Sequence, residues 1–177
     1  MSDLATLGAY GELIEPATLK IQRLLPGPIE RVWDYLTQTE LRRRWLASGD
    51  MPAQTGEGFE LVWRNDELTD PPGARPEGFS TEHRMESRVV ALEPPRRLVI
   101  TWGAQSEVEF GLDVQGAEVL LTVIHRRVPD RDTLLNVSAG WHAHIDVLAA
   151  LLSGQTPKPH WDNWVRLRSD YDARLPV

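Results

Sequence analysis

The chain has 177 residues, of which 41% are hydrophobic and 25% charged, a composition typical of globular proteins. It contains no cysteine, which excludes disulfides, thiolate metal sites and a cysteine nucleophile. The formal net charge is −7, and this acidic balance argues against a nucleic-acid partner and against an anionic membrane surface, because both attract cationic proteins.

The first part of the chain predicts one strand followed by two short helices. Residues 18–25 begin with alternating apolar and polar side chains, the pattern of a β-strand, and the Pro-Gly-Pro at 26–28 ends it. Apolar residues then recur at helical spacing over 29–36, and a second short helix is expected over 40–46. The basic cluster Arg42 to Arg44 on that helix is interpreted as a solvated face among acidic neighbours.

The middle of the chain predicts an antiparallel meander interrupted by one long loop. Residues 64–80 fit no period and are rich in Pro and Gly, which marks an irregular loop of the kind that often carries function. Short connections between the strands favour antiparallel pairing. The expected strands are residues 57–63, 82–92, 98–102, 107–114 and 118–127.

Two helices are expected at the end of the chain. The first begins at Thr133 and bends near Gly140, or begins at Ser138, and ends at Gly154; the second runs over 161–174. An antiparallel sheet with one dry face must be covered, and the longer helix has the apolar surface to do so. The sequence therefore predicts an α+β fold in which a curved antiparallel sheet wraps around a long C-terminal helix and leaves a space between them.

The sequence also resembles a known family. The motifs that carry the resemblance are PGPIERVWDYLT at 26–37, ELRRRWL at 40–46, EPPRRLVITW at 93–102, the strand ending in His125, and Gly140-Trp141 in the long helix. Together they are similar to bacterial START-like (SRPBCC) proteins, in the branch named for the activator of the ATPase of the ninety-kilodalton heat-shock chaperone. The resemblance spans residues 18–152. It implies a helix-grip fold with a hydrophobic cavity under the C-terminal helix, in a family whose members bind lipids, hormones or polyketides or assist a chaperone.

From the length and the resemblance, we expect one START-like domain over 1–177, with a core at 18–152 and a C-terminal helical extension at 153–177. Met1 to Gly11 has no basic region followed by an apolar run, so it is not a secretory signal. No stretch approaches the roughly 20 apolar residues that cross a bilayer. We therefore expect a cytoplasmic protein without membrane insertion.

The candidate ligand-binding residues are aromatic and histidine side chains with inward parity, among them His83 and His125. Such residues either line the pocket and orient a ligand or fill the core, a histidine there being satisfied by a backbone carbonyl or water. Trp161 and Trp164 on the last helix are expected to pack outside the grip or to form an oligomer contact. The candidates are Trp63, His83, Trp102, Phe110, His125 and Trp141.

No catalytic or metal site is predicted. His142 and His144 point about 200° apart on a helix, and His142 with Asp146 makes an incomplete set of ligands, so these three residues are interpreted as surface or capping groups. Glu107, Glu109 and Asp113 have the parity opposite to Phe110 and are expected to face solvent. We expect no metal and no cofactor.

The leading functional hypothesis is a non-catalytic binding protein whose cavity takes a small apolar or aromatic molecule, entering near the loop at 64–80. One alternative is a protein that interacts with a chaperone or acts in a stress response. The other is a cyclase- or hydrolase-like enzyme that uses the same cavity, an activity that the fold alone does not establish. The sequence leaves open whether the chain is a monomer or a homodimer.

Overall fold

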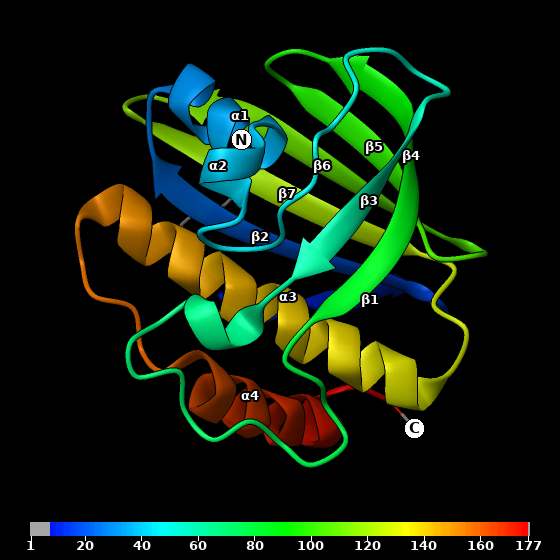
Figure 1. Ribbon diagram of the computed structural model, residues 1–177, viewed down its shortest axis with the longest axis vertical. Helices are drawn as coiled ribbons and strands as arrows, with labels where there is room; N and C mark the ends of the chain where they lie inside the picture. The colour runs from blue at the N-terminus through cyan, green and yellow to red at the C-terminus, as the bar shows by residue number, and fades with distance from the viewer. Residues whose placement is uncertain (1–7, 177) are drawn as a thin grey trace.

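The computed structural model describes residues 8–176 and has the α+β architecture that the sequence predicts (Figure 1). The strands are β1 (Glu12–Glu15), β2 (Thr18–Pro26), β3 (Gly58–Trp63), β4 (His83–Glu93), β5 (Arg97–Trp102), β6 (Ser106–Gln115) and β7 (Glu118–Arg126). The helices are α1 (Ile29–Thr37), α2 (Thr39–Arg42), the short 3-10 helix η2 (Asn65–Glu67), α3 (Arg131–Ser153) and α4 (His160–Arg174).

All seven strands form one antiparallel sheet in the order β1-β2-β7-β6-β5-β4-β3. The expected meander is confirmed over β3 to β7, and β2 joins it by pairing with β7, with Ile21 opposite Val123. The sheet curves around α3, which crosses its concave face, and α4 lies beside α3 on the side away from the sheet (Figure 1). This arrangement confirms the helix-grip fold.

The helix α3 is buried along most of its length because it fills the concave face of the sheet. Ala139, Ala143, Ile145 and Leu148 are all fully buried. The side chain of Asp130 caps the first turn by accepting from the Thr133 amide at 2.8 Å, so the helix begins before either predicted start and runs through residue 140 without a break. The helix is continuous at Gly140, because surrounding contacts offset the cost of a glycine in a helix, about 1 kcal/mol.

Two further boundaries differ from the sequence-based expectations. The edge strand β1 was not predicted, because four residues are too few to show a period. The helix α2 ends at Arg42 and continues as turns, although the sequence predicts a helix over 40–46. The interpretation of Met1 to Gly11 falls largely on residues outside the described range. Within residues 8–176, no helix is long and apolar enough to cross a membrane.

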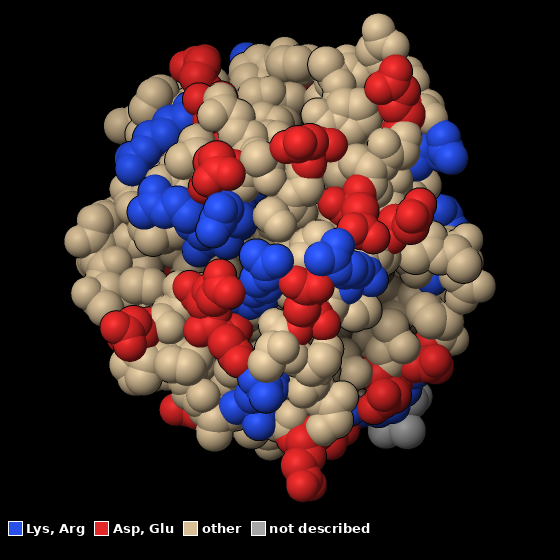
Figure 2. Space-filling model, viewed as in Figure 1, with Lys and Arg blue, Asp and Glu red and all other residues tan. Residues whose placement is uncertain are grey.

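The outer face of the sheet is covered by ion pairs. Glu109 accepts from both Arg97 and Arg126, at 2.9 Å each, and Glu107 pairs with Arg127 at 3.2 Å. These carboxylates lie on the outer face as expected, although Glu107 and Glu109 are half-buried by their partners. Figure 2 shows basic and acidic side chains interspersed over the face that it views, without a patch of one sign.

Arg42 corrects the interpretation of the basic cluster as a solvated face, since only 2% of this residue is exposed. Its Nε donates to the Ala47 carbonyl at 3.0 Å, its Nη1 to the Thr37 carbonyl at 3.1 Å, and its Nη2 to the Gly49 carbonyl. Burial lowers the pKa of Arg42 to about 10, which still leaves it charged at neutral pH. The guanidinium thus holds together the turn that follows α2.

Replacing Arg42 should destabilise the protein strongly. Arg42→Met leaves several buried carbonyls without a donor, and we expect the free energy of unfolding in urea to fall by about 3 kcal/mol. The neighbouring Arg43 is the matched control, because its half-exposed side chain only pairs with exposed Glu40. Arg43→Met should change stability by less than about 0.5 kcal/mol. Equal losses in the two variants would contradict this account of Arg42.

Candidate functional site

A cavity of about 320 Å³ lies between the concave side of the sheet, α3, α4 and the segment that joins β3 to β4. Its walls are mainly aromatic. Indole and phenyl rings reach it from the ends of two strands, from both long helices and from the connecting segment. These aromatic residues are Trp63, Phe79, Trp102, Trp141, Trp161 and Trp164.

Four of the six candidate residues line this cavity, namely Trp63, His83, Trp102 and Trp141. His83 is exposed at the rim, whereas Trp63 and Trp141 are buried. The structure places the remaining two, Phe110 and His125, beneath the cavity, where they support Trp141. Parity in the sequence predicts only which face of the sheet a side chain lies on. It could not distinguish residues that line the cavity from residues on the same face that the indole of Trp141 covers. The ligand-binding role of all six remains a prediction.

The wall formed by the sheet and α3 is a chain of tryptophans in edge contact. The ring centroids of Trp63 and Trp102 are 5.3 Å apart, and those of Trp102 and Trp141 are 5.1 Å apart. The indole N–H of Trp141 donates to Nδ1 of His125 at 3.0 Å, so this nitrogen carries no proton. Burial lowers the pKa of His125 to about 4 and keeps it neutral. The hydrogen bond fixes the orientation of the Trp141 ring.

The opposite wall is made by Trp161 and Trp164 of α4 together with Phe79. The Phe79 ring lies 5.5 Å from that of Trp161 and 5.2 Å from that of Trp164. The sequence-based interpretation, which placed the two tryptophans outside the grip or in an oligomer contact, therefore missed their place in the cavity. The available signal was their i, i+3 spacing on one helix face, but nothing local connects them with the residue-79 loop.

Two hydrogen bonds from backbone amides at the start of α4 hold the segment that follows β3. The amide of His160 donates to Thr69 Oγ1 at 2.9 Å, and the amide of Trp161 donates to the Pro72 carbonyl at 2.9 Å. Gly73 has a φ of +84°, and a Cβ there would lie 2.8 Å from the Asp162 amide nitrogen, so only glycine allows this approach. The long loop is thus an ordered part of the cavity wall.

His144 brings a polar group to the cavity, which it lines. Its Nδ1 lies 2.7 Å from the Trp45 carbonyl oxygen and must donate, because a carbonyl only accepts. Burial lowers the pKa of His144 to about 4, so the ring is neutral at pH 7. The expectation of a surface or capping role was wrong for both His142 and His144, which are 5% and 6% exposed. Tyr171 of α4 covers His142, whereas Trp45 and His160 contact His144.

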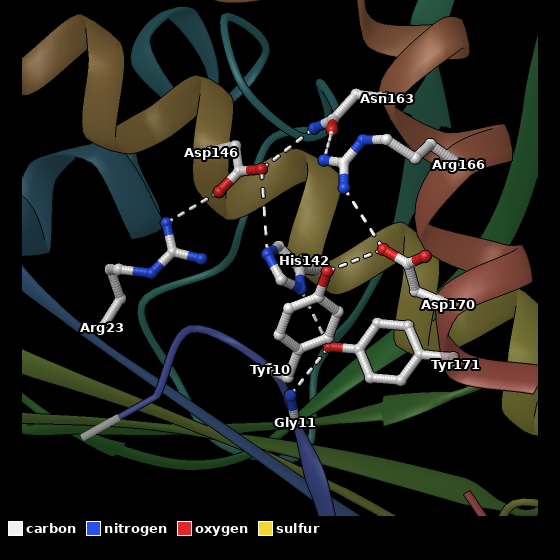
Figure 3. A network of polar contacts seen from close by, with 9 residues as sticks. All are labelled: Tyr10, Gly11, Arg23, His142, Asp146, Asn163, Arg166, Asp170 and Tyr171. Carbon is white, nitrogen blue, oxygen red and sulfur yellow. Dashed lines mark hydrogen bonds and ion pairs between the residues drawn. The ribbon is translucent and has the colours of Figure 1, made fainter. Parts of the chain in front are cut away.

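A buried network docks α4 onto α3 and onto the N-terminal segment (Figure 3). The Gly11 amide donates to the Tyr171 hydroxyl at 2.7 Å, and that hydroxyl lies 2.9 Å from Nδ1 of His142. Burial lowers the pKa of His142 to about 4, so the ring is neutral at pH 7 and shares one hydrogen bond with the Tyr171 hydroxyl. The Tyr10 hydroxyl donates to Asp170 at 2.7 Å on the same side of α4.

Asp146 completes this network at the next turn of α3. Its two oxygens accept from Arg23 Nη1 at 2.8 Å and from Asn163 Nδ2 at 2.9 Å, and Nε2 of His142 lies 3.9 Å from the carboxylate (Figure 3). His142 and Asp146, which the sequence suggested as an incomplete set of metal ligands, therefore take part in contacts that join β2, α3 and α4. Among residues 8–176, no three His, Cys, Asp or Glu side chains come together as a metal site would require.

A curved antiparallel sheet around a long helix, with an apolar cavity between them, defines a START-like domain. Residues 26–153 match the family described as Activator of Hsp90 ATPase homolog 1-like protein, and the chain belongs to this family. A comparison with curated proteins gives no match.

Solved structures with the same fold agree with this assignment. A Bordetella parapertussis protein solved by solution NMR is 40% identical, with a TM-score of 0.80, over 96% of this chain and 92% of that one. CalU16 from Micromonospora echinospora is 23% identical, with a TM-score of 0.65, over 92% and 93%. DynU16, a putative protein in the dynemicin biosynthetic locus, is 19% identical, with a TM-score of 0.63, over 82% of this chain and 51% of that one.

The four buried histidines predict a marked loss of stability in mild acid. Burial lowers the pKa of His125, His142 and His144 to about 4 and that of His160 to about 2. The unfolded state, with a histidine pKa of about 6.5, therefore binds more protons below that pH. The stabilisation is present above pH 6.5 and is lost as the pH falls from 6.5 towards 4. Each such histidine adds a slope of about 1.4 kcal/mol per pH unit.

Urea unfolding between pH 7 and 5 measures this slope. His160 is 1% exposed and neither of its ring nitrogens has a hydrogen-bond partner, so His160→Phe should fold and should reduce the slope by about 1.4 kcal/mol per pH unit. His83→Gln, at an exposed position, is the control. An unchanged slope in His160→Phe would show that this histidine is not buried in its neutral form.

Proposed function

We propose that this protein binds one small aromatic or apolar molecule in the cavity and does not act on it chemically. The observation that supports the proposal is the convergence of six aromatic side chains on one space of about 320 Å³, within the range of small-molecule sites. Aromatic walls on opposite sides suit a flat ligand, because rings pack by stacking and by edge contacts.

The segment around Phe79 is the proposed entrance. Gly78, Phe79 and Ser80 line the cavity and are all exposed, and Phe79 is 40% exposed although it is a large apolar residue. A ligand entering here would pass between Phe79 and His83 and reach Trp141 at the far wall. This agrees with the entry expected from the sequence, near the loop at 64–80.

A binding role is favoured over catalysis by the chemistry of the walls. Within the described part of the chain no carboxylate lines the cavity, so a pair of carboxylates for acid and base chemistry is not present there. The polar residues at the cavity are neutral at pH 7 or lie at the rim, as His144 and His83 do. A chaperone partner is suggested only by the family description, and no surface of the described residues marks its place.

The proposal predicts that both aromatic walls contribute to affinity. Naphthalene is a suitable probe, and calorimetric titration should give about a tenfold weaker dissociation constant for Trp164→Ala, because a stacked aromatic partner is worth roughly 1–1.5 kcal/mol. Val165→Ala on the exposed side of α4 is the matched control and should bind as the native protein does. Absence of naphthalene binding to the native protein would contradict the proposed function.

A further inference from the structure

The ring of His144 brings to the cavity a hydrogen-bond acceptor whose orientation the protein fixes. Because Nδ1 of His144 donates to the Trp45 carbonyl, Nε2 is the unprotonated nitrogen of this neutral ring. Nε2 makes no hydrogen bond within the described residues, although the residue lines the cavity and is only 6% exposed. The acceptor is thus oriented by the fold and left without a protein partner.

The surroundings of His144 leave this acceptor to the cavity. The ring of His160 packs against it with centroids 4.7 Å apart and makes no hydrogen bond to it. The other lining side chains on α3 are those of Trp141, one turn away, and of Val137 and Asn136, about two turns away, and Oδ1 of Asn136 accepts from Arg168 at 2.7 Å. A ligand that fills the cavity but carries no hydrogen-bond donor would displace water from Nε2 without replacing the lost hydrogen bond.

We infer that the ligand is an aromatic molecule carrying a hydroxyl or N–H group, which donates a hydrogen bond to Nε2 of His144. The inference rests on the proposed function and adds the polar group by which the cavity would recognise its ligand. Sites built to hydrogen-bond a ligand group reject analogues that lack it far better than apolar walls reject a change of size. His144 is therefore the residue that we expect to determine specificity in a cavity whose walls are mainly aromatic.

Two matched probes test this inference, namely 2-naphthol, which has a hydroxyl donor, and 2-methoxynaphthalene, in which that donor is methylated. Calorimetric titration at pH 7 should show 2-naphthol binding about tenfold more tightly to the native protein, the size of one hydrogen bond of about 1.4 kcal/mol. The variant His144→Asn keeps an amide donor near the position of Nδ1 and removes the acceptor at Nε2. It should bind both probes with similar dissociation constants.

A second buried histidine provides the control. His160 touches His144 but does not line the aromatic cavity, so His160→Asn should keep the preference for 2-naphthol. Thermal unfolding of both variants checks that they are folded at the titration temperature, and a His144→Leu variant, which has no acceptor, replaces His144→Asn if the latter is not.

The outcomes separate the inference from the proposed function. Equal binding of both probes to the native protein, or a preference for 2-naphthol that survives in His144→Asn, would overturn the inference and leave aromatic binding in place. Failure of both probes and of naphthalene to bind would overturn the proposed function itself. A preference for 2-naphthol that is lost only in the His144 variant supports both.

Discussion

The hydrogen-bond chain from the Gly11 amide through the Tyr171 hydroxyl to His142 fixes α4 against α3. Tyr171 and His142 are buried, and an unpaired buried polar group costs about 1–3 kcal/mol. These hydrogen bonds form only when α4 is rotated about its axis so that Tyr171 points towards α3. Asp146 adds a second constraint by accepting from both Arg23 and Asn163. The network therefore fixes the rotation of α4 about its axis.

Trp164 lies two turns before Tyr171 on the same side of α4, so the polar network and the aromatic cavity are two consequences of one docking geometry. The backbone contacts of α4 with Thr69 and Pro72 bring the loop after β3 to the same place and position Phe79. The family match ends at residue 153, so Trp161 and Trp164 of this second wall lie outside it. The sheet and α3 supply one wall of the cavity, and α4 supplies most of the other.

The sequence predicted the parts of the structure that depend on local periodicity and left out those that depend on tertiary contact. Strands β3 to β7 followed from alternation, and Trp63, Trp102 and Trp141 were found because inward parity and cavity position coincide there. Trp161 faces the cavity because of partners about 90 residues earlier in the chain, which no local pattern reveals. Arg42 and His144 were misplaced for the same reason, since charge and polarity predict exposure unless a fold supplies carbonyl partners.

The central claim is that a ligand lies between the grip and α4, in contact with both. The direct measurement is a set of intermolecular nuclear Overhauser effects between bound naphthalene and the indole protons of the protein in solution. We expect contacts to Trp141 of α3 and to Trp164 of α4 in the same complex, because both line one cavity. Contacts to only one of these walls, or to exposed residues away from the cavity, would contradict the account.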